Sequence, residues 1–127
     1  MINIDDLIGV NYCVNGRSIE TGFDCLGLAI EVERRFGHIL PDLDEAKIDD
    51  YDFALCQKLC LSKIKNIVPV SKAEKEGDLI LFEDNSGVMF HIGVYLGNNK
   101  FIHCNKYGVH LTEVGRIYKV GVVYRWQ

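Results

Sequence analysis

One cysteine and two later histidines are the residues of this chain whose types and spacing could do covalent chemistry. Cys25 lies within Gly22–Leu28 (GFDCLGL), where a glycine-containing loop runs into an amphipathic stretch, so we expect its thiol at a helix N-terminus. Unpaired N–H groups and the helix dipole stabilise a thiolate there, which predicts a thiol pKa below the ordinary value of about 8.5. His91 and His103 follow on a predicted hairpin. A thiol with a later imidazole is the pairing that nucleophilic catalysis uses.

A helix over Cys25–Phe36 is predicted to carry the cysteine. Its apolar residues recur at three- and four-residue steps, its charged residues occupy the other face, and Gly37 is a typical helix stop. The other predicted elements of the first half are a short helix or turn over 5–10, a loop over 11–22, a loop over 38–50 and a second helix over 50–64.

The second half of the chain is rich in β-branched and aromatic residues, which is typical of strands. The predicted strands cover 79–82, 88–96, 100–104 and 120–126. Helices followed by an antiparallel sheet predict an α+β fold, in which N-terminal helices pack against the sheet.

The loop between the strands over 88–96 and 100–104 decides whether the two histidines meet. A two-residue turn at Asn98 and Asn99 places His91 and His103 on opposite faces of the hairpin. A three-residue loop that includes Gly97 places them diagonally on one face, about 7–8 Å apart at the backbone. Catalysis therefore predicts the three-residue loop, with the glycine at position 93 leaving room between the imidazoles.

Composition limits the classes of protein to which the chain can belong. With 127 residues, 48% of them hydrophobic, it is expected to form one domain over residues 1–127. A net charge of -4 with interspersed signs argues against nucleic acid as a partner. The acidic N-terminus lacks the pattern of a secretory signal, and no apolar run approaches the ~20 residues of a membrane span. We therefore expect synthesis in the cytoplasm and no membrane span.

The five cysteines form an odd set without the spacing of a disulfide scaffold, so they are expected to be thiols in a reducing compartment. Cys56 and Cys60, four residues apart on the second predicted helix, are assigned to the core. Cys25 and Cys104 could form a zinc site with the two histidines, but the short-spaced ligand pairs usual for zinc are missing, apart from the adjacent His103 and Cys104. No metal and no cofactor are predicted.

Three blocks of the sequence resemble the NlpC/P60 family of papain-like cysteine peptidases. Residues 22–28 are similar to the family's G-x-D-C-S-G-L block, and residues 76–82 (EGDLILF) to its P-G-D-L-x-x-F block. The third similarity joins residues 91–97 (HIGVYLG) and 101–103 (FIH) to its H-V-G-I-Y-L-G and F-I-H segments. The blocks occur in the family's order and span most of the chain.

The resemblance implies a papain-like fold and a role for each matched residue. Cys25 would attack a peptide carbonyl, His91 would be the general base, and His103 would orient it. Tyr12 would help to line the oxyanion site, and Asp24 with the residue after the cysteine would bind the free amine of a cell-wall stem peptide. The implied substrate is a peptidoglycan stem peptide, cut after γ-D-glutamate through an acyl-enzyme.

The chain departs from the family's pattern at four places and leaves other functions open. Leu26 stands where the family has serine, and the other departures are Asn11, Asn15-Gly16 and Glu76. The bulky Leu26 and the opening IGVNY segment at 8–12 resemble the phage-tail branch of the family, which would make phage tail proteins partners and the chain virion-associated or released. The alternatives are a phage tail module or peptide-binding domain with a vestigial triad, and a related thiol acyltransferase or small-molecule amidase.

Overall fold

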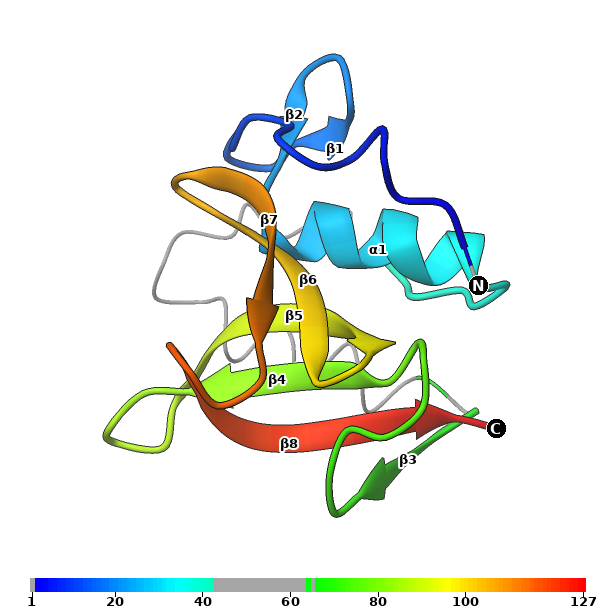
Figure 1. Cartoon of the computed structure of the whole chain (residues 1–127), viewed down its shortest axis with the longest axis vertical. Helices are drawn as coiled ribbons and strands as arrows, with labels where there is room; N and C mark the ends of the chain where they lie inside the picture. The colour runs from blue at the N-terminus through cyan, green and yellow to red at the C-terminus, as the bar shows by residue number, and fades with distance from the viewer. Residues whose placement is uncertain (1, 43–63, 65) are drawn as a thin grey trace.

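The computed structural model describes residues 2–42, 64 and 66–127. Its described elements are one helix, a two-stranded sheet and a six-stranded sheet (Figure 1). In chain order they are β1 (Arg17–Ser18), β2 (Gly22–Phe23), α1 (Cys25–Arg35), β3 (Ile67–Val70), β4 (Leu79–Glu83), β5 (Met89–Gly97), β6 (Lys100–Asn105), β7 (Gly108–Glu113) and β8 (Lys119–Trp126).

The six-stranded sheet is antiparallel throughout, in the order β3-β8-β4-β5-β6-β7. Helix α1 packs on β5 and β6 and lies between this sheet and the small β1–β2 hairpin (Figure 1). The main core lies beneath the helix, where Leu28 and Val32 meet Ile92, Val94 and other apolar side chains of the sheet. The α+β prediction is therefore confirmed for the antiparallel sheet and its packed helix.

Helix α1 begins and ends close to the predicted residues. Asp24 is its N-cap, in extended conformation, and accepts a hydrogen bond of 2.7 Å from the Gly27 amide. Gly37 follows the C-cap with φ of 88°, a conformation that glycine adopts without steric cost. Residues 5–9 form turns rather than a helix. The second predicted helix, including Cys56 and Cys60, falls outside the described residues except Ile64, so a pair of N-terminal helices is not confirmed.

The four predicted strands are all present, as β4, β5, β6 and β8. Strands β3 and β7 were not predicted, and the predicted loop over 11–22 contains β1 and the first residue of β2. β3 contains Pro69 and pairs with β8 alone among the described strands, which fits the rule that proline is confined to edge strands. No helix among the described residues is long and apolar enough to cross a membrane.

The β5–β6 hairpin reaches the register that brings its histidines together, but by an unpredicted route. Val94 pairs with Ile102, whereas Gly97 pairs with Lys100, so Leu96 is an extra residue on β5. The turn is two residues long, with Asn98 and Asn99 both at positive φ. The predicted three-residue loop is therefore wrong. A two-residue turn alone would place the two histidines on opposite faces of the hairpin. The extra residue of the bulge shifts the register by one and returns them to the same face.

Candidate active site

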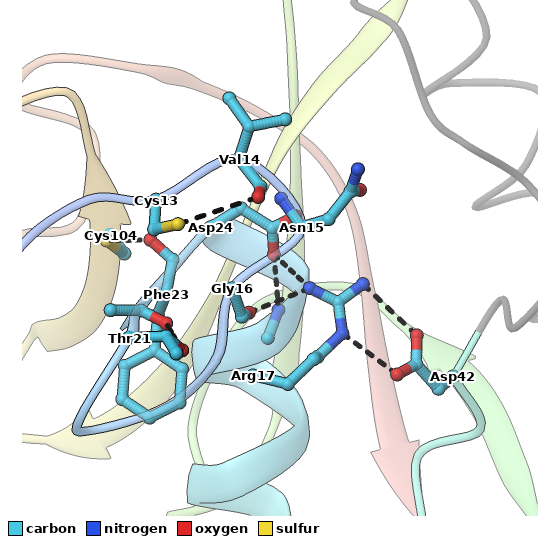
Figure 2. A network of polar contacts seen from close by, with 12 residues as sticks. Cys13, Val14, Asn15, Gly16, Arg17, Thr21, Phe23, Asp24, Asp42 and Cys104 are labelled. Carbon is cyan, nitrogen blue, oxygen red and sulfur yellow. Dashed lines mark hydrogen bonds and ion pairs between the residues drawn. The ribbon is translucent and has the colours of Figure 1, made fainter.

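Cys25 is the first residue of α1, and its surroundings fix the loop that precedes it. The Cys104 thiol donates a 3.1 Å hydrogen bond to the backbone carbonyl of Phe23, two residues before Cys25 (Figure 2). Cys104 directly follows His103 on β6. This contact therefore attaches the loop of the candidate nucleophile to the strand that carries the second histidine. Cys13, Cys25 and Cys104 are free thiols.

The two histidines contact each other directly. His91 Nε2 lies 2.8 Å from His103 Nδ1, and the two rings meet edge to face. His91 is 5% exposed and His103 is fully buried. The space predicted beside Gly93 is not empty, because a Cβ built there would lie 2.7 Å from the Phe101 ring. Glycine at this position accommodates Phe101, on which the His103 ring packs in turn.

Thr112 extends the chain of polar contacts, and the sequence did not single it out. Its Oγ1 lies 2.8 Å from His103 Nε2, on the neighbouring strand β7. If His91 is to accept a proton on Nδ1, its own proton must sit on Nε2 and point to His103. His103 then carries its proton on Nε2 and donates it to the Thr112 hydroxyl. One set of tautomers thus satisfies both contacts and leaves His91 Nδ1 free to act as a base.

Cys25 and His91 line a common pocket of about 490 Å³, whose other lining residues are Tyr12, Val14, Asp24, Phe90, Cys104, Asn105, Lys106, Tyr107 and Tyr118. His103 is not among the lining residues, because it lies behind His91. Four of the described lining residues are tyrosine or phenylalanine. Because His103 does not reach the pocket, it can act only through His91.

Burial sets the protonation states of the site. It raises the pKa of the Cys25 thiol far above its ordinary value, an effect that the nearby Asp24 carboxylate reinforces and that the backbone amides of Ile92 and Leu26 oppose. The predicted lowering of this pKa by the helix terminus is therefore wrong. Burial also lowers the pKa of His91 to about 4 and that of His103 to about 3, with His110 acting in the same direction. The resting site holds a neutral thiol and two neutral imidazoles.

The other two predicted site residues, Tyr12 and Asp24, also line the pocket, but Asp24 is paired with a cation that was not predicted. Tyr12 lines the pocket with 40% of its surface exposed. Asp24 caps α1 and forms a 2.7 Å ion pair with Arg17, a residue that sequence reasoning did not select. Among the described residues, no three His, Cys, Asp or Glu side chains are grouped to hold a metal ion.

The NlpC/P60 family model matches residues 9–125, almost the whole chain. The chain belongs to the NlpC/P60 family. It is 30% identical over 115 residues to murein DD-endopeptidase MepH of Escherichia coli (strain K12), which covers 87% of this chain and 38% of MepH. The chain thus spans well under half of that relative.

Solved NlpC/P60 structures share the fold. An NlpC/P60 family protein from Bacillus cereus ATCC 10987 superposes with a TM-score of 0.66 at 24% identity, covering 94% of this chain and 36% of that one. The peptidoglycan hydrolase RipB from Mycobacterium tuberculosis gives 0.60 at 26% identity, covering 94% and 58%. Neither of these structures nor MepH carries a name that connects it with phage tails.

Proposed function

We propose that this NlpC/P60 chain is a cysteine peptidase that hydrolyses amide bonds in peptidoglycan stem peptides. The observation that carries the proposal is the 2.8 Å contact between His91 and His103 behind a pocket that Cys25 and His91 both line. A nucleophile, a base and a group that orients the base are the three parts that thiol-dependent acyl transfer requires. Here they come from α1, β5 and β6.

The reaction begins from the neutral pair. His91 Nδ1 takes the proton from the Cys25 thiol as the sulfur attacks the carbonyl carbon of the scissile amide. The backbone N–H of Cys25, which has no acceptor within its own helix, stabilises the tetrahedral oxyanion, and Tyr12 lines the same region. His91 then gives its proton to the departing amine, which leaves a thioester. Water, deprotonated by His91, cleaves the thioester and restores the thiol.

His103 and Thr112 act through His91 rather than on the substrate. Their two hydrogen bonds hold the His91 ring in one orientation and keep its proton on Nε2. A neutral imidazole that carries its proton there is a base at Nδ1 throughout the neutral pH range. The Cys25 sulfur is therefore not a thiolate at rest. It loses its proton to His91 only as it attacks the carbonyl carbon.

The proposed scissile bond follows γ-D-glutamate in the stem peptide. Family membership supports a peptidoglycan substrate, as do the names of MepH and RipB, which refer to murein and peptidoglycan. MepH is named a DD-endopeptidase, which is a different specificity from cleavage after γ-D-glutamate. The choice between these bonds requires analysis of the products.

Mass spectrometry of digested peptidoglycan tests both the activity and the bond. We expect the purified chain to release fragments that end in γ-D-glutamate, together with fragments that begin at the next residue. Cleavage within the cross-links instead would overturn the proposed bond and keep the peptidase. If the folded protein released no peptide fragments, the peptidase proposal would be wrong, and a binding module in the same fold would take its place.

A further inference from the structure

The carboxylate beside the nucleophile is already occupied by the protein itself. Asp24 Oδ1 accepts hydrogen bonds from the Gly27 amide and from Arg17 Nη1, both at 2.7 Å. Its other oxygen, Oδ2, accepts a hydrogen bond of 3.1 Å from the backbone N–H of Asn15. A carboxylate offers about four acceptor positions, so three are filled from within the chain, one of them by a cation. The Asp24 side chain is also only 15% exposed.

Arg17 is held in this position from its other side. Figure 2 shows its guanidinium between Asp24 and Asp42. Arg17 Nε and Nη2 donate to the two carboxylate oxygens of Asp42 at 2.8 and 3.1 Å, while Nη1 also donates to the Gly16 carbonyl. Two parallel N–H···O contacts of this kind fix both the plane of a guanidinium and the position of its charge. Arg17 therefore cannot swing away from Asp24 without breaking a bidentate ion pair.

Among the residues that the structure describes, the rest of the pocket offers no other anion to a substrate. The charged lining residues in this part of the chain are Asp24 and Lys106. Lys106 lies over the ring of Tyr107, 5.1 Å from the ring centroid, and forms no ion pair within the described part of the chain. Leu26, beside the nucleophile, is 2% exposed and belongs to the core. With Asp24 neutralised, the pocket presents aromatic surface and one positive charge.

We propose that Arg17 is a specificity-determining residue that prevents Asp24 from binding a substrate ammonium group. The site then takes stem peptides whose N-terminus is acylated, as part of a larger molecule, rather than short peptides with a free amine. This inference rests on the proposed function for its substrate class. It makes Arg17, a residue on β1 outside the catalytic group, the determinant of whether a free or an acylated N-terminus is accepted.

A pair of peptides that differ only at the N-terminus tests the inference. The peptide Ala-γ-D-Glu-Lys amide is prepared with a free amine and with an acetyl group, and each is titrated against the Cys25→Ala variant by calorimetry. We expect the acetylated peptide to bind at least as tightly as the free one. Adding Arg17→Met should shift the ratio of the two dissociation constants about tenfold toward the free amine, the size of one partly buried charge pair.

The control variants separate a role in specificity from a role in folding. Arg34→Met, which removes an exposed arginine of α1 that pairs with Glu31, should leave the ratio unchanged. Arg17→Lys keeps the cation but loses the bidentate contact with Asp42, so it should give a smaller shift than Arg17→Met. Asp42→Asn loosens the hold on Arg17 and should give an intermediate shift even if Arg17→Met fails to fold. Tighter binding of the free amine by the parent variant, or an unchanged ratio in Asp42→Asn together with any folded Arg17→Met, would overturn the inference.

Binding by the Cys25→Ala variant is independent of hydrolysis. Absence of cleavage by the parent chain with the expected binding ratio would contradict the peptidase and keep the role of Arg17. Cleavage by the parent chain, together with tighter binding of the free amine, would keep the peptidase and contradict the role of Arg17.

Discussion

Replacing Cys25 with alanine is expected to lower kcat/KM for stem-peptide hydrolysis by roughly 10⁴-fold or more, because the nucleophile that forms the acyl-enzyme is gone. The residual rate would come from the pocket and the oxyanion donors alone. The side chain is small and sits in the first turn of α1, so the fold should persist. Product release measured by liquid chromatography gives the rate, and thermal unfolding checks the fold.

Cys13→Ala is the matched control for the loss of a thiol. Cys13 is also partly buried, and its sulfur contacts only the Val14 carbonyl, at 3.7 Å, among the hydrogen bonds of the described residues. We expect this variant to keep activity within a few-fold of the parent chain. Substantial hydrolysis by a folded Cys25→Ala protein would assign the chemistry to another group.

Replacing His91 with alanine is expected to lower kcat by roughly 10³-fold or more, since the Cys25 thiol then has no base to take its proton. The loss should be larger than for a group that was already a thiolate, because burial keeps this thiol protonated. His103→Asn, which retains a polar partner for His91, should lose much less. Equal losses in the two variants would contradict a distinction between base and orienting residue.

The pH dependence of kcat/KM follows from the same groups. His91 acts as a base only when neutral, and burial lowers its pKa to about 4. Activity should therefore be retained as the pH falls through 6.5, the ordinary histidine value, and be lost as the pH falls through about 4. An acetylated peptide amide is the suitable substrate for the measurement. An acidic limb with its midpoint near 6.5 would show that His91 is not held neutral by burial.

The amphipathic periodicity of residues 25–36 and the β-rich second half were enough to predict α1 and four strands of the sheet. Strand β7 was missed although its GVHLTE sequence alternates apolar and polar residues from Val109 to Thr112. This alternation does not follow the observed burial, because Leu111 is exposed and Thr112 is buried. The hairpin loop was predicted from the face that the histidines must share, whereas the turn type and a β-bulge together set the register. Paired asparagines at positive φ form a two-residue turn, and only the bulge at Leu96 reconciles that turn with the histidine register.

The residues of the candidate site could be proposed from the sequence, but their electrostatics could not. The order of Cys25, His91 and His103 along the chain and their flanking blocks selected two histidines that contact each other and a cysteine that lines the same pocket as His91. The helix terminus suggested a stabilised thiolate, but the opposing effect of burial depends on packing that a sequence does not show. Thr112 and Arg17 were missed for a related reason. Thr112 contacts His103 on a neighbouring strand, and Arg17 pairs with Asp24, and the sequence does not show either contact.

The most direct test of the account is to trap the intermediate on Cys25. A stem-peptide nitrophenyl ester has a good leaving group, so acylation is fast and the thioester accumulates before water cleaves it. Intact-mass measurement after acid quenching, followed by peptide mapping, should find one acyl group on Cys25 in the parent chain and none in Cys25→Ala. Turnover of the ester with the acyl group on another residue, or with Cys25 unmodified throughout, would contradict the account.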